Sequence, residues 1–158
     1  MTSDKFTAVE GFSLQQYLGT WYEIARLDHS FERGLSQVTA TYSLREDGGV
    51  RVINRGFNTE TSEWESAEGK AYFIGDATTG ALKVSFFGPF YGAYNVVALD
   101  HEDYQYSLVA GPSHKYLWIL ARSPQLEPAT LDQLLEKARE LGFDTGQLIF
   151  PEHDESNT

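Results

Sequence analysis

Residues 19–26 have the sequence GTWYEIAR, and residues 118–122 have the sequence WILAR. We interpret these two segments as the first and the last strand of one sheet. Gly19 and Trp21 open the first segment, and a single Arg122 closes the second. If the sheet is closed, the Trp21 ring plugs the floor of a barrel and the Arg122 guanidinium lies on that ring from outside. Such a cation–π contact contributes about 0.5–2 kcal/mol, depending on its exposure. A barrel closed in this way encloses a space, which predicts a binding function.

Between these segments, apolar and polar residues alternate in runs that turn signals separate at roughly 8–15-residue intervals, a spacing typical of all-β folds. Tight turns are predicted at Glu46–Gly49, where glycine takes positive φ, and at Asp76–Gly80 and Asp100–Asp103. Eight strands in simple succession predict an all-β, antiparallel, up-and-down β-barrel. The expected strands lie near residues 20–28, 37–45, 49–57, 64–74, 80–87, 93–100, 104–110 and 115–122.

After the strands, the apolar period changes from two to steps of three and four. This period runs from Pro128, in the first helical turn, to Leu141, and Gly142 provides the stop, so we expect an amphipathic C-terminal α-helix over residues 128–141, packed outside the barrel. A short strand at 147–150 and a frayed acidic tail at 151–158 follow. Without a linker or internal repeat, residues 1–158 are expected to form a single domain, with the barrel at about 19–122.

Composition excludes several classes of function. The formal net charge of the 158-residue chain is −11, which argues against nucleic-acid binding and against electrostatic docking to anionic lipid. There are no cysteines, so disulfides, thiolate catalysis and zinc–thiolate sites are absent from the chain. No apolar run reaches the ~18 residues that a membrane-spanning helix needs. The first residues contain no apolar signal region, so either a leader was removed or the protein is cytoplasmic.

These residues resemble the lipocalin family, and most closely its bacterial lipoprotein branch. The family's first motif matches Gly19 and Trp21, and its third matches Arg122. Its second motif, Thr-Asp-Tyr, is matched only in part, because Asp100 is present and Tyr104 falls a few residues late. Further similarity is carried by the segments HSFERG at 29–34, GKAYF at 69–73 and FFGPFYG at 86–92.

The resemblance implies an eight-stranded calyx with one open end, which binds a fatty acid or a lysophospholipid and needs no cofactor. Bacterial members carry a lipid-modified N-terminal cysteine that anchors them to the outer membrane. Because this chain has no cysteine, any such anchor is absent from the sequence given. If a leader was removed, we expect the protein on the periplasmic face of the outer membrane, in lipid maintenance of the cell envelope.

A period of two from Trp21 predicts which side chains face the interior. On the first strand Glu23 and Ala25 share the inner face, and Ala98 does so on the sixth. The small inner residues leave volume, and tyrosine and asparagine groups orient a polar end of the ligand. The alternative is a core filled by these same aromatic side chains. The ligand-binding residues predicted from this register are Ala40, Tyr42, Val52, Asn54, Ala71, Val84, Phe86, Tyr94, Val96, Tyr116 and Trp118.

Loops at the mouth add two further expectations. Phe31 and Arg33 belong to the long first loop, where Arg33 either binds a carboxylate or phosphate head group or forms a salt bridge with a nearby acid. Phe87, Phe90 and Tyr91 flank a Gly-Pro turn. Their rings either form an apolar patch for a membrane or for a second copy of the chain, as in a homodimer, or pack within the loop.

Enzyme signatures are weak. The four histidines are scattered, so no metal site is predicted, and no Gly-x-Ser-x-Gly elbow or phosphate-binding glycine loop is present. An inward Glu23 in apolar surroundings would have a raised pKa, and we expect a hydrogen bond to an interior tyrosine. The sequence therefore predicts a lipid-binding protein without catalysis. The alternative is an enzyme that acts on a small apolar substrate, with Glu23 or an interior tyrosine as acid–base.

Overall fold

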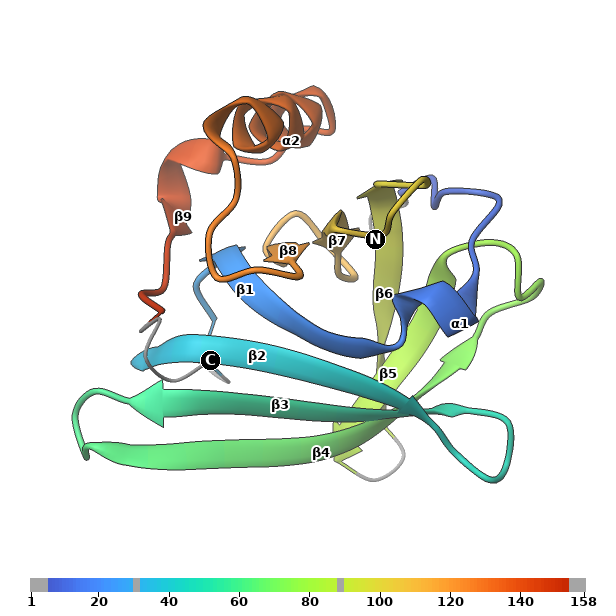
Figure 1. The fold of residues 1–158 in the computed structure, drawn as a ribbon, viewed down its shortest axis with the longest axis horizontal. Helices are drawn as coiled ribbons and strands as arrows, with labels where there is room; N and C mark the ends of the chain where they lie inside the picture. Colours follow the sequence, from blue (N-terminus) through green and yellow to red (C-terminus); the bar gives the residue numbers. More distant parts are fainter. Residues whose placement is uncertain (1–5, 30–31, 88–89, 154–158) are drawn as a thin grey trace.

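The computed structural model describes residues 6–29, 32–87 and 90–153, without the side chains of Phe87 and Phe90. Its elements follow one another around a barrel, with one longer helix outside (Figure 1). In chain order they are α1 (Leu14–Tyr17), β1 (Gly19–Leu27), β2 (Leu35–Leu44), β3 (Val50–Asn58), β4 (Glu63–Phe73), β5 (Ala81–Phe87), β6 (Phe90–Leu99), β7 (Tyr106–Ala110), β8 (Leu117–Ala121), α2 (Pro128–Glu140), a 3-10 turn (Thr145–Gln147) and β9 (Leu148–Ile149).

The sheet is closed. Strands β2 to β8 pair antiparallel in sequence order, and β1 pairs with both β8 and β2. The predicted fold class, an eight-stranded up-and-down barrel with a C-terminal helix outside, is therefore confirmed. The added strand β9 extends β1 on its free side at Arg26 and Leu27. It is shorter than the strand predicted at 147–150.

The register places one row of side chains on the inside. Trp21 lies opposite Ala40, Ala40 opposite Asn54, and Asn54 opposite Ala67. Since side chains two residues apart share a face, this row fixes the inner face of the first four strands. The register predicted from Trp21 is correct for the inner residues predicted on β2, β3 and β4 and, on β1, as far as Glu23.

The register shifts at four points in the described sheet, and two of these shifts correct predictions. A bulge between Glu23 and Ala25 turns Ala25 to the outer face of the barrel wall, so Arg26 takes the inner position opposite Trp118. A second bulge between Val96 and Ala98 moves Ala98 outward in the same way. A bulge inserts one unpaired residue and so exchanges the two faces beyond it.

Apolar side chains form two cores, one inside the barrel and one between the barrel wall and α2. The inner core contains Trp21 and Phe12, and the outer core joins Leu134 and Ala138 of α2 to strands β1, β6, β7 and β8. In Figure 1 the helix lies over these strands on one side of the barrel. The sequence period therefore identified both the helix and the face that it buries.

One end of the barrel is closed by the segment before β1, where α1 lies in Figure 1. The guanidinium carbon of Arg122 lies 3.8 Å from the centroid of the Trp21 ring, as predicted. Arg122 also donates to the backbone carbonyls of Gln16 (2.8 Å), Leu18 (3.0 Å), Thr20 (3.1 Å) and Tyr104 (3.0 Å). These bonds tie the end of β8 to α1 and to the start of β1.

The turn before β7 explains why that strand begins at Tyr106 and not at residue 104. Tyr104 has a φ of 52°, which takes it out of the extended conformation. The Asp100 carboxylate accepts backbone N–H groups of Glu102 (3.2 Å) and Asp103 (3.3 Å), and the Tyr104 hydroxyl accepts from the Ser13 backbone (2.9 Å).

The C-terminal segment is packed as far as His153, which corrects the prediction of a frayed tail from residue 151. The carbonyl of Glu152 accepts from the Gln37 backbone N–H at 2.8 Å. His153 Nε2 donates to the Glu23 carbonyl at 2.8 Å, and its ring meets Tyr22 edge-on. The pairing of β1 with β2 ends at Tyr22, so this segment bridges the two strands where they diverge. Residues 154–158 lie outside the described residues.

Strand β4 is paired on one side only along half of its length. It pairs with β3 from Glu63 to Ala71, whereas its pairing with β5 begins at Lys70. Within the described residues, no strand therefore pairs with the other side of Glu63–Gly69. The β3–β4 hairpin extends beyond the remaining strands in Figure 1.

Candidate functional site: a cavity inside the barrel

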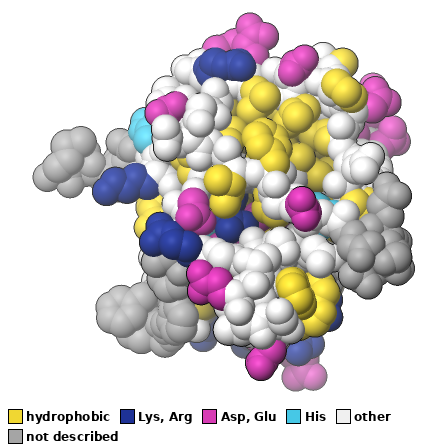
Figure 2. Space-filling view, turned by 90° about the vertical axis from the view of Figure 1, so that its left-hand side faces the viewer, with side chains coloured by type: hydrophobic (Ala, Val, Ile, Leu, Met, Phe, Trp, Pro, Cys, Tyr) yellow, Lys and Arg dark blue, Asp and Glu magenta, His cyan; other side chains and the backbone are white. Residues whose placement is uncertain are grey.

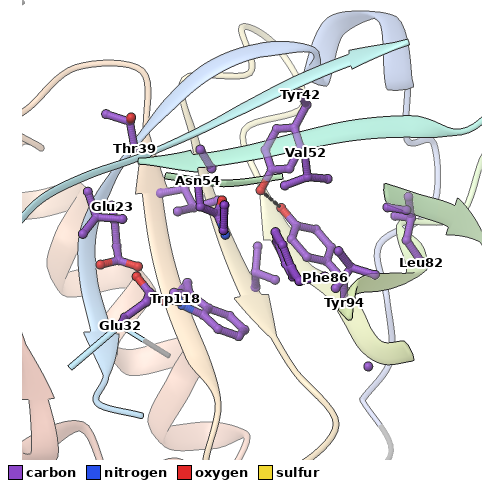
Figure 3. Close-up of a pocket in the computed structure, with 18 of the residues that line it drawn as sticks. Glu23, Glu32, Thr39, Tyr42, Val52, Asn54, Leu82, Phe86, Tyr94 and Trp118 are labelled. Carbon is purple, nitrogen blue, oxygen red and sulfur yellow. Dashed lines mark hydrogen bonds between the residues drawn. The ribbon is translucent and has the colours of Figure 1, made fainter. Parts of the chain in front are cut away.

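A cavity of about 490 Å³ lies inside the barrel, with a mainly apolar lining. Sites for one small organic molecule have volumes of roughly 300–1,000 Å³. The interior is thus hollow, and the alternative of a barrel filled by its own aromatic side chains is wrong. Figure 3 shows lining side chains from several strands converging on this space.

Ten of the eleven residues predicted to bind ligand border the cavity. Val96 does not: it is fully buried and packs against Gly80, where a Cβ atom would lie 3.0 Å from the valine. Val96 belongs instead to the buried cluster inside the barrel. The ten that border the cavity are Ala40, Tyr42, Val52, Asn54, Ala71, Val84, Phe86, Tyr94, Tyr116 and Trp118.

Buried tyrosines on one side of the cavity bond to one another. The Tyr94 hydroxyl lies 2.7 Å from that of Tyr17 and 2.8 Å from that of Tyr42, and Tyr17 also bonds to Ser107 at 3.1 Å. Burial raises the pKa of Tyr17 to about 12 and the pKa values of Tyr42 and Tyr94 well above the ordinary value. All three phenols are therefore neutral at physiological pH.

Charged side chains gather on another side of the cavity. Glu23 is buried, and its Oε2 accepts from Arg26 Nη1 at 2.8 Å, so the predicted bond from Glu23 to an interior tyrosine is wrong. Burial, followed by the neighbouring charge of Glu32, raises the pKa of Glu23 well above its usual range. Figure 3 shows the carboxyl groups of Glu23 and Glu32 directed toward one another beside Trp118.

Glu32 joins the connection between β1 and β2 to the barrel wall. Its Oε1 accepts from Trp118 Nε1 at 2.9 Å and from His29 Nε2 at 2.7 Å. Burial alone would raise the pKa of Glu32, but hydrogen bonds from His29, Glu23 and Trp118 lower it to about 2. A carboxyl with a raised pKa, Glu23, thus lies beside one with a lowered pKa, Glu32, and Arg26 is the cation next to Glu23.

At the mouth, Arg33 takes the second of its two predicted roles. Its Nε donates to Asp28 Oδ2 at 3.0 Å and its side chain is exposed, so it forms a surface salt bridge. Phe31, Gly88 and Pro89 lie outside the described residues, as do the side chains of Phe87 and Phe90. Tyr91 is exposed and has the Lys83 ammonium 4.9 Å from its ring centroid.

Several lining residues were not predicted from the sequence. Leu14 and Tyr17 reach the cavity from α1, which is too short to give a periodic signal. His29 and Glu32 lie in a polar loop, and Glu65 lies near the tip of the β3–β4 hairpin. Val50 and Leu82 lie two residues from Val52 and Val84, which were predicted to line the cavity. Since residues two apart share a face of a strand, the alternation could have identified them.

A family model described as a lipocalin-like domain matches residues 12–153. The chain belongs to the lipocalin-like family. The model covers the whole barrel, α2 and the packed C-terminal segment, which agrees with the resemblance carried by Gly19, Trp21 and Arg122.

Relatives of this lipocalin include bacterial lipoproteins. The outer membrane lipoprotein Blc of Vibrio cholerae is 59% identical over 142 residues, which cover 90% of this chain and 83% of the relative. Blc of Escherichia coli is 57% identical over 144 residues, covering 91% and 81%. The names of these relatives refer to the outer membrane, which agrees with the location predicted from the sequence, the bacterial cell envelope.

More distant relatives share the domain. Temperature-induced lipocalin-1 of Arabidopsis thaliana is 38% identical, with 100% of this chain and 91% of the relative covered. Among solved structures, insecticyanin from Manduca sexta superposes with a TM-score of 0.77 at 25% identity, over 97% of this chain and 87% of that one. This lipocalin fold therefore extends well beyond bacteria.

Two searches of the described residues were negative. In residues 6–29, 32–87 and 90–153, no group of three or more His, Cys, Asp or Glu side chains is arranged to hold a metal ion. Over the same part of the chain, neither helix is long and apolar enough to cross a membrane.

Proposed function

We propose that this lipocalin binds one lipid, a fatty acid or a lysophospholipid, in its cavity and carries or stores it in the bacterial cell envelope. The cavity itself is the observation that carries the proposal, because a hollow apolar interior of about 490 Å³ suits an acyl chain. Its apolar walls include Val52, Val84 and Leu82, and its polar groups include the tyrosine hydroxyls on one side and the carboxyl groups of Glu23 and Glu32 on another.

The arrangement supports a bound molecule with two unlike ends. Apolar lining residues take the chain, because burying its methylene groups contributes about 0.8 kcal/mol for each CH₂. The charged cluster around Glu23 and Glu32 would face the polar end. The family relationship to outer membrane lipoproteins supports the envelope as the place where the lipid is acquired.

Displacement of N-phenyl-1-naphthylamine, an uncharged fluorescent probe, tests this function. Lysophosphatidylethanolamine or a long-chain fatty acid added to the loaded protein should remove the probe signal saturably. Mass spectrometry of lipids extracted from the purified protein should show the same class. If neither lipid displaces the probe and the extract is empty, the proposal is wrong.

A second candidate is an enzyme acting on a small apolar substrate. It is favoured by the proximity of two carboxyl groups whose pKa values are shifted in opposite directions, raised for Glu23 and lowered for Glu32, because such a pair separates an acid from a base. Both carboxyls are engaged by Arg26, His29 and Trp118, which suits a structural cluster equally well. Turnover across a panel of isomerisable and hydrolysable lipids would favour the enzyme, and a flat result would eliminate it.

A further inference from the structure

The turn between β2 and β3 contains the sequence Asp47-Gly48, and Asp47 is the only Asp or Asn of the chain that a glycine follows. This turn lies at the closed end of the barrel, because Tyr42, near the end of β2, is opposite Gly19 at the start of β1. In Figure 1 this end is opposite to the β3–β4 hairpin. Figure 2 shows the hairpin end, where acidic side chains surround a group of hydrophobic ones. The turn is therefore remote from the mouth of the cavity.

An Asp-Gly bond is a place where a chain can isomerise without an enzyme. The backbone nitrogen of Gly48 attacks Cγ of Asp47, the amide proton and the carboxyl O–H leave as water, and a five-membered imide forms. Water then opens the imide at Cγ, which restores aspartate, or at the main-chain carbonyl, which yields isoaspartate. Glycine favours the attack because it has no side chain to hinder it. Nothing lies within 4 Å of a Cβ added at Gly48, and the Asp47 side chain is 46% exposed, so water reaches both residues.

The two reacting groups are nevertheless held by other partners. Asp47 Oδ1 accepts from Arg45 Nε at 3.1 Å and from the Gly49 backbone N–H at 3.0 Å. Asp47 Oδ2 accepts from the Tyr72 hydroxyl at 2.7 Å. The Gly48 N–H donates to the Arg45 carbonyl at 3.2 Å. The carboxyl group cannot rotate toward the amide, and the amide cannot turn toward the carboxyl, unless these bonds break first.

The same contacts also make the carboxyl group less reactive. Hydrogen bonds from Arg45 and then from Tyr72 lower the pKa of Asp47, so the group is ionised at neutral pH. A carboxylate is a much poorer target for a nucleophile than a neutral carboxyl group, because its negative oxygen is a poor leaving group. The Tyr72 ring is itself fixed against the turn, since a Cβ added at Gly49 would lie 2.4 Å from it.

We propose that Asp47-Gly48 is the site at which this chain forms isoaspartate, and that the clamp of Tyr72 and Arg45 on Asp47 keeps this reaction slow in the folded protein. The product has one more main-chain carbon in the turn. That carbon displaces Gly49 from its place against the Tyr72 ring, and Val50, the next residue, lines the cavity. The clamp therefore protects the hairpin that forms this part of the cavity wall.

Ageing of the purified protein at pH 7.4 and 37 °C for several weeks tests the site and the clamp. One sample is folded, and a second is kept unfolded in guanidinium chloride. After proteolysis, chromatography with mass spectrometry separates the isoaspartate peptide from the aspartate peptide of equal mass. We expect isoaspartate at position 47 in both samples, forming at least about tenfold more slowly in the folded protein, because the reaction there requires local opening of the turn.

A substitution separates the clamp from folding in general. Tyr72→Phe keeps the ring that packs on Gly49 and removes the hydroxyl that bonds to Asp47. Isoaspartate should form at least about threefold faster in this folded variant, since a hydrogen bond to a charged group is lost. Tyr106→Phe, which removes a phenol hydroxyl on β7, is the matched control and should age like the parent.

Each possible result decides one part of the proposal. Isoaspartate that accumulates at other positions of the unfolded chain but not at 47 would overturn the assignment of the site. Equal rates in the folded and unfolded parent would overturn the protection by the fold. A Tyr72→Phe variant with the parent's circular dichroism and the parent's rate would overturn the role of Tyr72.

Discussion

Arg122 covers the Trp21 ring from outside, with its guanidinium carbon 3.8 Å from the ring centroid, while Trp21 itself is fully buried. The indole Nε1 donates to the Tyr17 carbonyl at 2.8 Å, so both faces of this contact are tied to the segment before β1. Neither residue is among those that border the cavity. We therefore assign this pair to stability.

Arg122→Ala should lower the free energy of unfolding by about 2–4 kcal/mol. The variant loses the cation–π contact with Trp21, which contributes about 0.5–2 kcal/mol. It also loses the hydrogen bonds from the charged guanidinium to backbone carbonyls, and a hydrogen bond to a charged group contributes about 1.5–3 kcal/mol. The midpoint of urea unfolding measures this loss, and lipid affinity should stay nearly unchanged. Arg51→Ala, which removes an exposed pair with Glu68, is the control and should leave the midpoint almost where it was. A collapse of lipid affinity in a folded Arg122→Ala variant would contradict the assignment.

Glu23→Gln should flatten the pH dependence of stability. Because burial raises the pKa of Glu23 in the folded state, the native protein holds this proton more tightly than the unfolded chain does. The contribution of Glu23 to stability is fully present at pH values below the ordinary glutamate pKa of about 4.5. It is lost as the pH rises through the raised pKa of the folded state. Urea midpoints at pH 5, 7 and 9 should fall less in the variant than in the parent. Parallel profiles would show that Glu23 is ionised in the native protein.

Ala67→Phe should block ligand binding while keeping the fold. Ala67 lies on the inner face of β4 beside the cavity, so a phenyl ring there occupies space that a lipid needs. We expect at least about tenfold weaker displacement of the fluorescent probe, with little change in Tm. Ile53→Phe on the outer face of β3 is the matched control. Equal lipid affinity for the two variants would place the ligand outside the barrel.

Gly69→Ala should destabilise the barrel by about 1–3 kcal/mol, the usual cost of an overpacked site. An added Cβ would lie 2.6 Å from the Ser85 carbonyl oxygen and 2.7 Å from the Phe86 ring, so β5 would have to move away from β4. Gly92→Ala is the control, since nothing lies within 4 Å of its added Cβ. Thermal unfolding of both variants measures the difference, and equal Tm values would show that β5 yields without cost.

The architecture was predictable because it depends on repeated signals. Alternation of apolar and polar residues marked every barrel strand, and steps of three and four marked α2. Trp21 then fixed the inner faces of strands that run without interruption. Ala25 and Ala98 were assigned to the wrong face because a bulge is a local backbone event, and the residue types around it do not announce it.

The site was only partly predictable. Residues such as Tyr42 and Trp118 follow from strand parity, whereas Glu32 lies in a loop and meets Trp118 only through the fold. His153 likewise reaches Glu23 across almost the whole chain. Polar residues in loops have no period from which a partner can be inferred, so these contacts require the structure.

The half-paired strand β4 has a consequence for behaviour at high protein concentration. Its open edge presents free backbone groups, which in other proteins recruit a strand from a neighbouring molecule. Here Glu63, Glu65 and Glu68 lie along that edge. If the β4 edges of two molecules approached one another, these negatively charged side chains would repel each other. The hairpin can therefore project into solvent without acting as a template for aggregation, and neutralising these three acids would remove that protection.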